Sequence, residues 1–282
     1  MRIGPRTFVW GARTYIMGVI NVSPDSFSGD GVGSADEAVE LARRFVDEGA
    51  DILDVGGQST RPAADRTKAG FDEITDAEEI RRVAPAIERI RCELPDTAIS
   101  VDTYKPAVAC AALDAGADML NDIYGFRRDP EIARIAAKAG VPALAMHNQR
   151  GRRSDDVMAS VLEGLLESIA IAEREGLPRE RLIVDSGFGF GWTAEHNIEM
   201  LRRLRELEVL RLPVLIGTSR KSTIGAVLGG ADVPERIFGT AASVALSIAR
   251  GADIVRVHDV AAMKQVALVA DAIVRGWLRD GV

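Results

Sequence analysis

Eight short apolar runs in this chain end on a polar or charged residue, and a segment with helical periodicity follows nearly every one. The runs are almost continuously apolar, as strands buried on both faces of a parallel sheet are. The residues that end them are Asn21, Gln58, Asp102, Asn121, His147, Asp185, Ser219 and His258. This alternation predicts an α/β protein, a single (β/α)8 or TIM barrel whose strand ends meet at one mouth, where catalytic groups are expected.

The 282 residues are enough for one such barrel, which takes about 250 residues, and a short extension. Gly11 lies at a turn between residues 8–9 and residues 15–22. We therefore expect residues 1–14 to form a β-hairpin extension that leads into the first strand and closes the bottom of the barrel. Residues 15–282 are expected to form one barrel domain, because no linker divides them.

The first and last helical segments each have an apolar face at steps of three and four residues. The first segment begins near Ser34 and ends before Gly49. Its face consists of Ala38, Leu41, Ala42, Phe45 and Val46, and that of the last consists of Val266, Val269, Ala270, Ile273, Val274 and Trp277. We expect both faces to pack against the outside of the barrel.

The composition excludes several classes of protein. With 47% hydrophobic and 27% charged residues the chain is typical of soluble globular proteins, and no apolar run approaches the ~20 residues of a membrane span. The net charge of −7 argues against a nucleic-acid partner, although a local basic cluster could still hold a small anion. The first ten residues lack the apolar stretch of a signal peptide. Cys92 and Cys110 lack metal-ligand spacing and are expected to have structural roles, which fits a reducing compartment. We therefore expect a cytoplasmic protein.

An anion site is predicted after the seventh and eighth strands. The sequence GTSRKS, residues 217–222, combines hydroxyl groups and two cations just before a helical segment, as in many phosphate-binding barrels. Arg256 and His258 are two residues apart on the next strand, so both side chains are on one face. The alternative is that these cations are solvated surface charges.

Two carboxylates and an amide end the third, fourth and sixth strands. Asp102, Asn121 and Asp185 could together bind a flat, nitrogen-rich heterocycle, because carboxylates accept from paired N–H donors and an amide both donates and accepts. Each residue taken alone could instead cap the helix that follows it.

The segment after the fifth strand contains one histidine and three arginines. His147 could be an acid or base, a metal ligand or a buried residue satisfied by the backbone, and we favour a structural role because no second ligand has suitable spacing. Arg150, Arg152 and Arg153 are expected to lie in a solvated loop, where they could help to steer an anionic substrate.

Seven motifs occur together and in order, from about Tyr15 to the end of the chain. They are MGVINVSPDSFS (residues 17–28), GGQSTRP (56–62), SVDTYKP (100–106), NDI (121–123), DSGFGFG (185–191), GTSRKS (217–222) and RVHDV (256–260). Together they resemble dihydropteroate synthase of the folate pathway. The resemblance implies a transferase that condenses 7,8-dihydropterin-6-ylmethyl diphosphate with 4-aminobenzoate to give 7,8-dihydropteroate and diphosphate.

The resemblance also implies a role for each matching residue. The pterin would be bound by Asp102, Asn121, Asp185, Met146 and Lys221. The diphosphate would be bound by Asn21, Arg61, Ser219, Arg256 and His258, with Asn21 also binding a bridging Mg²⁺. The 4-aminobenzoate would be bound by Phe27, Thr60, Arg61, Pro62, Phe190, Lys221 and Ser222. The catalytic residues would be Lys221, Arg256, Asp185 and Arg61.

The implied partners are these small-molecule substrates and a second copy of the chain, because the family is commonly dimeric through helices remote from the mouth. Mg²⁺ and the cations would stabilise the leaving diphosphate, and the pterin ring would spread the positive charge left on its methylene carbon. The expected reaction is thus a largely dissociative substitution without a protein nucleophile.

Departures from the usual family pattern gather around the aminobenzoate entrance. Asp30 is displaced by one position, Gln58 replaces glutamate, Ser186 replaces proline and Trp192 stands where lysine is common, while the loop after Pro62 is longer than usual. These changes motivate the hypothesis of altered sulfonamide sensitivity, although the insertion typical of mobile resistance synthases is absent. Sulfonamide inhibition constants compared with the KM for aminobenzoate would test it.

Three rival interpretations are open at the level of sequence. A methyltetrahydrofolate-binding methyltransferase domain would share the Asp and Asn set but would not need both the TRP and SRKS motifs. A pterin-binding paralogue without synthase activity would fail to support growth of a synthase-deficient strain. An unrelated phosphate-binding barrel lyase would leave the ring-binding set unexplained.

Overall fold

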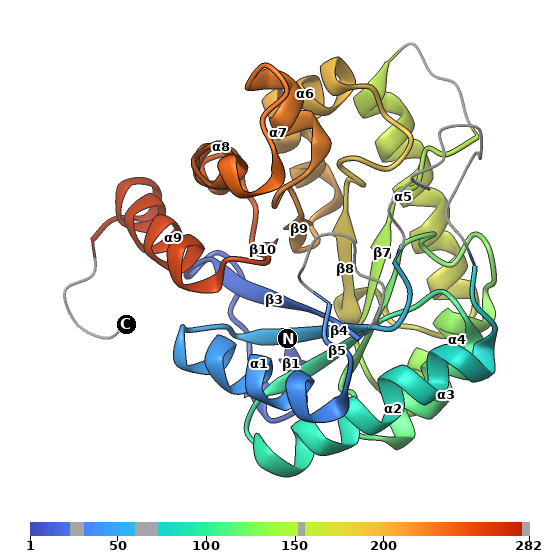
Figure 1. Cartoon of the computed structure of the whole chain (residues 1–282). Coiled ribbons are helices and arrows are strands. Elements are labelled where there is room, and N and C mark those ends of the chain that lie inside the picture. The colour runs from blue at the N-terminus through green and yellow to red at the C-terminus, as the bar shows by residue number, and fades with distance from the viewer. Residues whose placement is uncertain (23–30, 60–72, 152–155, 278–282) are drawn as a thin grey trace.

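A closed barrel of eight parallel strands is the centre of the molecule (Figure 1). The computed structural model describes residues 1–22, 31–59, 73–151 and 156–277. In chain order the barrel strands are β3 (Tyr15–Asn21), β4 (Ile52–Gly56), β5 (Ala98–Asp102), β6 (Met119–Asp122), β7 (Ala143–Met146), β8 (Leu182–Asp185), β9 (Val214–Ile216) and β10 (Ile254–Val257). Each strand pairs with the next, and β10 pairs with β3, so the predicted (β/α)8 barrel is confirmed.

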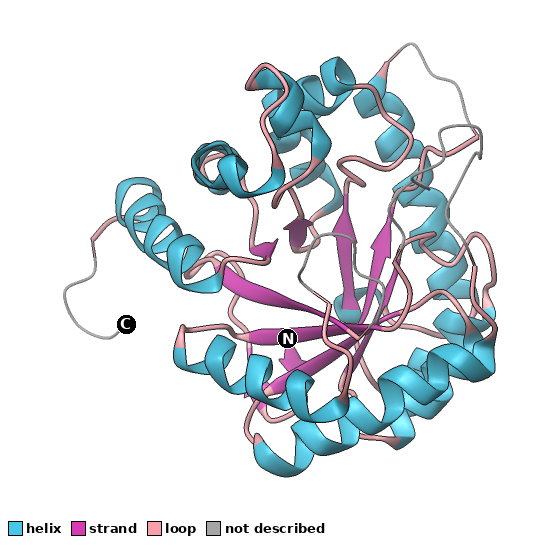
Figure 2. Cartoon of the chain, in the orientation of Figure 1, coloured by secondary structure: helices cyan, strands magenta, loops and turns pink. Residues whose placement is uncertain are grey.

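Helices surround these strands on the outside (Figure 2). Those within the described residues are α1 (Ala35–Asp47), α2 (Asp76–Glu93), α3 (Pro106–Asp114), α4 (Glu131–Ala139), α5 (Val157–Arg174), α6 (Ala194–Arg202), α7 (Ser222–Val227), α8 (Ile237–Ile248) and α9 (Val260–Arg275). Short 3-10 helices are η1 (Arg179–Arg181), η2 (Leu204–Leu210) and η3 (Val233–Arg236). In the part of the chain that the structure describes, no helix combines the length and apolar character needed to cross a membrane.

The strand register brings polar residues from neighbouring strands to one level at the mouth. Asp102 of β5 pairs with Asn121 of β6, and Met146 of β7 pairs with Asp185 of β8. Because alternate residues of a strand face opposite sides of the sheet, the strand ends project these side chains into the barrel while intervening residues contact the helices. The fold therefore gathers residues that are far apart in sequence.

The N-terminal hairpin is present, but its strands differ from the expected ones. It pairs β1 (Arg2–Ile3) with β2 (Arg6–Thr7), so pairing of residues 8–9 with residues 15–22 was wrong. The turn forms earlier because Gly4 adopts a φ of +54°, which glycine tolerates. Ile3 and Phe8 are buried in one cluster with inward-facing barrel residues such as Met17 and Ile52, so the hairpin covers the end of the barrel opposite the mouth.

Of the two predicted helix faces, one is confirmed and the other is confirmed only in part. Helix α1 is capped by Ser34, which accepts a hydrogen bond from the backbone of Glu37, and its predicted face packs on the sheet. In helix α9 the predicted Ala270 is buried and Val266 packs against the core, but Ile273 is 78% exposed. The buried side of α9 also includes Met263 and Ala267, which were not predicted. Periodicity identified an apolar face in α9 but not what covers it.

The two cysteines are exposed and form no disulfide, so neither has the packing role expected from the sequence.

Phe8→Ala is expected to lower the free energy of unfolding by about 3 to 5 kcal/mol, because it empties a buried site at the closed end of the barrel. Equilibrium urea denaturation followed by circular dichroism measures the change. The neighbouring Val9, which is exposed, is the control, and Val9→Ala should change the free energy of unfolding by less than about 0.5 kcal/mol. Equal effects of the two substitutions would contradict burial of Phe8 beneath the barrel.

Candidate active site

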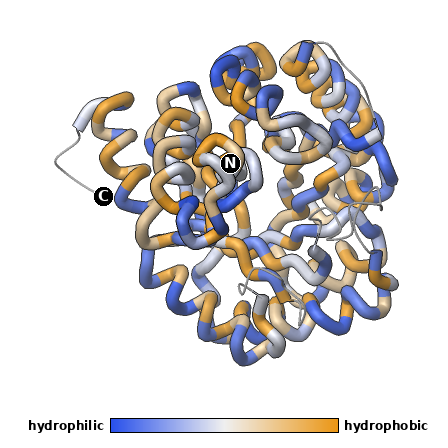
Figure 3. The backbone as a smooth tube through the Cα atoms, turned by 45° about the horizontal axis from the view of Figure 1, so that its top comes forward, coloured by the Kyte–Doolittle hydropathy of each residue, from blue (hydrophilic) through white to orange (hydrophobic). Residues whose placement is uncertain are grey.

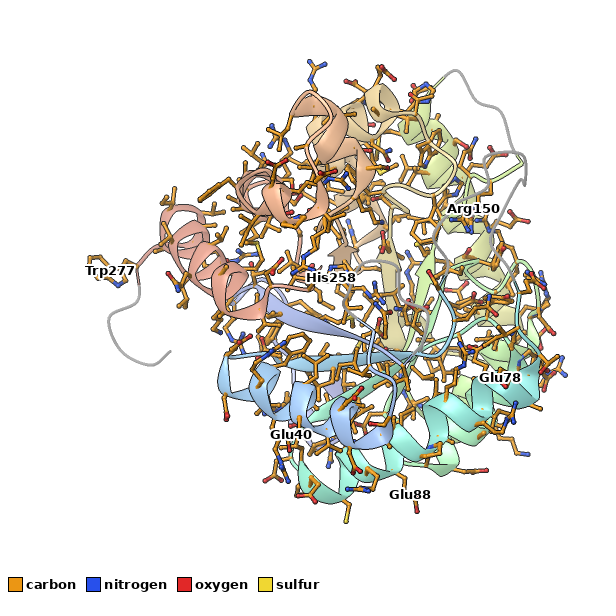
Figure 4. All side chains as sticks on the ribbon, viewed as in Figure 1. Glu40, Glu78, Glu88, Arg150, His258 and Trp277 are labelled. Carbon is orange, nitrogen blue, oxygen red and sulfur yellow. The ribbon has the colours of Figure 1, made fainter. Side chains whose placement is uncertain are left out.

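A cavity opens at the carboxyl ends of the barrel strands. It is lined by Asp102, Asn121, Ile123, Met146, Asp185, Phe190, Gly217, Ser219, Lys221, Arg256 and His258. His258 lies among the strand ends at the centre of the molecule (Figure 4). The cavity therefore brings together all five residues assigned to the pterin and three of those assigned to the diphosphate.

The polar residues at the strand ends do not have the alternative roles considered from the sequence. The N-caps of α3, α4 and α6 are Lys105, Pro130 and Thr193, so Asp102, Asn121 and Asp185 do not cap the helices that follow them. Lys221 and Arg256 line the cavity, so they are not solvated surface charges.

Arg256 is the central cation of the cavity. Its Nε donates to Asp54 Oδ2 at 2.6 Å, and its Nη2 donates to Asp102 Oδ2 at 2.7 Å. Asn121 Nδ2 donates to the same oxygen of Asp54 at 3.0 Å. Burial opposes the charge on Arg256, but the two carboxylates outweigh that effect and raise its pKa. Arg256, which was assigned to the anion, is thus connected to Asp102 and, through Asp54, to Asn121, which were assigned to the heterocycle.

Three other cavity groups have pKa values that burial moves toward neutrality. Burial raises the pKa of Asp102 to about 7, against the opposing influence of Arg256. Burial also raises the pKa of Asp185, although Lys221 works against the shift. The pKa of Lys221 falls to about 8, again through burial and against the attraction of Asp185. Asp102 and Lys221 therefore change their protonation state close to neutral pH.

Lys221 is held beside the aromatic wall of the cavity. Its ammonium donates to the backbone carbonyl of Phe188 and lies 4.6 Å from the centre of the Phe190 ring. The guanidinium of Arg150 lies 4.9 Å from the same ring centre. Burial lowers the pKa of Arg150, so the expectation that this arginine is solvated was wrong. Arg152 and Arg153 lie outside the described residues.

The anion end of the cavity is formed by the turn after β9 and the end of β10. Ser219 Oγ lies 3.0 Å from His258 Nδ1 and accepts from the His258 backbone. Arg220 has a positive φ of 57° and makes a bidentate ion pair with Asp259. This strained turn lets Ser219 and Lys221 both face the cavity while Arg220 points to α9.

Most residues assigned to the outer part of the site are not described by the structure, and the described ones, Asn21 and Ser222, are not in the cavity lining. Phe27, Thr60, Arg61, Pro62 and Asp30 lie outside the described residues, as does the long loop after Pro62. Ser222 is the exposed first residue of the short helix α7 and adjoins Lys221. Asn21 ends β3 and is half-buried, with its backbone carbonyl accepting from Val32.

The residues present fit a metal only if it arrives with the diphosphate. No cluster of three or more histidine, cysteine, aspartate or glutamate side chains suited to a metal occurs in the described ranges. Asn21 offers one amide oxygen, and Mg²⁺ is commonly bound by few protein ligands together with substrate phosphates and water. The donor set of the described residues is compatible with an ion bridged by the substrate.

His147 and Trp192 belong to the packing layer outside the barrel. His147 is fully buried, and its Nε2 lies 2.9 Å from Gln149 Oε1. A Cβ at Gly164 of α5 would lie 2.1 Å from His147 Nδ1, so this histidine packs closely on that helix. Trp192 lies between His147 and His196, with ring-centre distances of 5.9 and 5.6 Å, and is absent from the cavity lining. The structural interpretation of His147 agrees with these contacts.

Gln58 lies beside the mouth at the centre of a hydrogen-bond network. Its Oε1 accepts from Lys105 Nζ at 2.9 Å and from the Ile74 backbone at 3.1 Å, and its Nε2 donates to the Tyr104 hydroxyl at 2.9 Å. Lys105 also pairs with Glu79 at 2.8 Å. Gln58, which follows β4, is thus linked to the residues directly before α2.

A wider groove of about 880 Å³ adjoins the cavity between α1 and α9 and shares His258 with it. Acidic side chains of α1, including Asp36, Glu37 and Glu40, line the groove. Carboxylates outnumber the cations Arg44 and Arg220 in this groove, which disfavours an anion. The smaller cavity, where Lys221 and Arg256 lie together, is the better candidate for anion chemistry.

Two side chains at or beneath the site were not predicted from the sequence. Ile123 follows Asn121 by two residues and forms part of the apolar wall. Asp54 was overlooked within the strand sequence DILDV, where a charged residue inside an apolar run was a usable signal. Together the cavity offers acceptors for N–H donors, flat apolar walls and cations at one end. It can hold a planar nitrogen heterocycle that carries an anionic substituent.

Comparison with known proteins agrees with this geometry. Residues 17–258 match the family described as pterin binding enzyme. A dihydropteroate synthase of Clostridium beijerinckii is 44% identical over 277 residues, which cover 98% of this chain and 100% of that protein.

Two solved structures are similar over almost the whole chain. Dihydropteroate synthase of Clostridium difficile, crystallised with pteroic acid, has a TM-score of 0.88 and 45% identity, covering 95% of this chain and 100% of that one. The Xanthomonas albilineans enzyme with 4-aminobenzoic acid has a TM-score of 0.85 and 40% identity, covering 93% of each chain. The chain therefore belongs to the pterin-binding enzyme family and, within it, to the dihydropteroate synthases.

Proposed function

We propose that this transferase condenses 7,8-dihydropterin-6-ylmethyl diphosphate with 4-aminobenzoate, giving 7,8-dihydropteroate and diphosphate in folate biosynthesis. The observation that carries the proposal is the single cavity in which Asp102, Asn121 and Asp185 adjoin Lys221 and Arg256. The similar structures with pteroic acid and 4-aminobenzoic acid support the same substrate class. A methyltransferase domain or a silent pterin-binding paralogue is not favoured, because the similar proteins are named as synthases.

The pterin is proposed to lie deep in the cavity between Ile123, Met146 and Phe190. Ionised Asp102 and Asp185 accept hydrogen bonds from ring N–H groups, and the Asn121 amide adds a further contact. The positive charge of Lys221 favours the ionised form of Asp185 and limits the repulsion between the buried carboxylates. This arrangement orients the ring so that its methylene carbon faces the mouth.

The diphosphate is proposed to lie toward Ser219, Arg256 and His258. As the carbon–oxygen bond breaks, its electron pair goes to the diphosphate, and these donors stabilise the growing negative charge. The aromatic amine then forms the new carbon–nitrogen bond and loses one proton to solvent or to the leaving group. Arg61 is proposed to assist as a further cation.

Mg²⁺ bound with the diphosphate would supply further charge neutralisation, with Asn21 as its protein ligand. The 4-aminobenzoate is proposed to enter beside Phe190, Lys221 and Ser222. Phe27, Thr60, Arg61 and Pro62 are proposed to complete this entrance. The hypothesis of altered sulfonamide sensitivity remains a prediction, and the position of Trp192 away from the cavity gives it no support.

We also propose that the protein is a homodimer. Phe238 and Leu246 are exposed on α8, while Val269, Ile273 and Trp277 form an exposed row along and just beyond α9. The two helices pack side by side, and α8 contains no charged residue. Trp277 points away from the body of the molecule (Figure 4), and hydrophobic positions recur on the helix leading to the C-terminus (Figure 3). A second copy would cover this surface symmetrically.

A cytoplasmic location is proposed as well, because the exposed thiols of Cys92 and Cys110 fit a reducing compartment.

Lys221→Ala and Arg256→Ala are each expected to lower kcat/KM by about 10²-fold or more, because each removes a cation from the reacting region. Diphosphate release by purified protein, and growth of a synthase-deficient strain without folate products, measure the effect. Circular dichroism controls for folding. Near-normal turnover in either variant would contradict the assignment, and a wild-type protein that cannot restore growth would favour the silent paralogue.

Affinity for the pterin alcohol that lacks the diphosphate is expected to be highest between about pH 7 and pH 8. Below the pKa of about 7, Asp102 becomes protonated and loses its role as an acceptor, and above the pKa of about 8 Lys221 loses its charge. Lys221→Arg should extend the alkaline limit upward without moving the acid limit, because guanidinium remains protonated. Fluorescence titration measures both limits, and an unmoved alkaline limit would exclude Lys221 as its cause.

Ile273→Asp combined with Phe238→Asp should convert the dimer into a folded monomer, because each change buries a charge in the proposed interface. Sedimentation velocity measures the mass. Leu166→Asp on α5, where Leu166 is 52% exposed, is the control and should leave the dimer intact. A monomeric wild-type protein would refute the proposed dimer.

A further inference from the structure

Asp54 is a buried carboxylate beneath the candidate active site. It lies in the middle of β4, has no exposed surface and is paired in register with Ser100 of β5 and Val19 of β3. Asp54 is absent from the cavity lining, whereas its two partners Asn121 and Arg256 both belong to it. Any effect of Asp54 on a substrate must therefore act through those partners.

The contact with Asn121 determines which end of the amide faces a ligand. An ionised carboxylate can only accept hydrogen bonds, so Asn121 must turn its NH2 group toward Asp54. This agrees with the 3.0 Å hydrogen bond from Asn121 Nδ2 to Asp54 Oδ2. The carbonyl oxygen of Asn121 is then the group offered to the cavity. Without Asp54 the amide could rotate by half a turn and present donors where the ring would meet an acceptor.

The contact with Arg256 fixes a second group. Asp54 Oδ2 accepts from Nε at 2.6 Å, while Asp102 accepts from Nη2 at 2.7 Å, so two edges of the planar guanidinium are held. Because Asp54 balances this charge from below, Asp102 can turn toward a ring without leaving the arginine unpaired. One oxygen thus connects a proposed ring ligand with a proposed diphosphate ligand.

Stability alone does not explain a charge at this position. Burying a carboxylate is costly, and replacing buried ion pairs by apolar residues is often neutral or stabilising. The other oxygen of Asp54, Oδ1, is buried and accepts no hydrogen bond from the residues that the structure describes. The inward positions Ile52 and Met17 are apolar, and the hydroxyl of the neighbouring Ser100 is itself buried without a hydrogen bond to the described residues. A carboxylate that is only partly satisfied here indicates a functional constraint.

We propose that Asp54 is a positioning residue that sets the orientation of the Asn121 amide and the plane of Arg256, so that ring binding and diphosphate departure depend on the same buried carboxylate. The proposal rests on the proposed roles of Asn121 and Arg256.

The first test compares two buried aspartates of the same region. Asp51 precedes β4 and pairs with Arg13 at 2.6 Å, so it matches Asp54 in burial and in having an arginine partner, but it is not in the cavity lining. Asp54→Val is expected to weaken binding of the pterin alcohol by about 10²-fold and to lower kcat by about 10²-fold. The reason is that Asn121 and Arg256 would no longer be held in the productive geometry. Asp51→Val should change thermal stability while leaving both quantities within about threefold of wild type.

The second test uses an exchange of side chains and does not depend on Asp54→Val being folded. Asn121→Asp alone places two carboxylates together and should weaken pterin binding by about 10²-fold. The double variant Asp54→Asn with Asn121→Asp restores a donor opposite an acceptor and should recover at least about tenfold of that loss. Purely additive effects of the two changes would overturn the proposal, as would equal losses in Asp54→Val and Asp51→Val.

Pterin binding is measured without the diphosphate and without turnover. A wild-type protein that binds the pterin alcohol but forms no dihydropteroate would therefore refute the proposed synthase reaction separately. The binding comparisons would still decide whether Asp54 positions Asn121.

Discussion

The ion pairs of Arg256 hold the active site together. Its guanidinium lies among carboxylates from two other strands, at 2.6 Å from Asp54 and 2.7 Å from Asp102. Buried carboxylates without a cation would be protonated or hydrated, and a buried guanidinium without carboxylates would be strongly disfavoured. The closed barrel brings β4, β5 and β10 close enough for this mutual compensation. The same charges that need each other for folding are thereby placed around a cavity, where a charged substrate can compete for them.

Much of the fold could be predicted because buried parallel strands leave a strong sequence pattern. The apolar runs gave the eight barrel strands, and the Ser34 cap gave the start of α1. The pattern could not identify what lies opposite an apolar face, so α9 was expected to bury Ile273, which is exposed. It also could not choose among short pairings near the N-terminus, where β1 and β2 have two residues each. Both errors concern tertiary or quaternary context that local periodicity does not contain.

Most of the predicted residues that line the cavity lie at or near the ends of strands, whereas a supporting carboxylate inside β4 was not predicted. Asp102, Asn121, Asp185 and His258 mark strand ends, and all of them line the cavity. Asp54 lies two residues before the end of β4 in an otherwise apolar sequence, so its inward orientation depends on the strand register. Arg150 was misjudged for a different reason, since its place against Phe190 depends on two separate loops meeting. A resemblance in motifs predicts which residues bind ligands. A supporting charge such as Asp54 is recognised only from the register of the strands.

Gln58, one of the departures from the usual family pattern, lies apart from the residues proposed to bind the ring. Gln58 lies outside the ring cavity and donates to Tyr104 while accepting from Lys105 and Ile74. A glutamate there could keep both accepted bonds and accept a third from the tyrosine hydroxyl, but it would add a second negative charge beside Glu79. The neutral amide therefore satisfies a donor and two acceptor contacts without disturbing the Lys105–Glu79 pair. Because none of these groups contacts Arg256, variation at Gln58 can alter how the chain is held beside the mouth while the charge balance that binds the ring is unchanged.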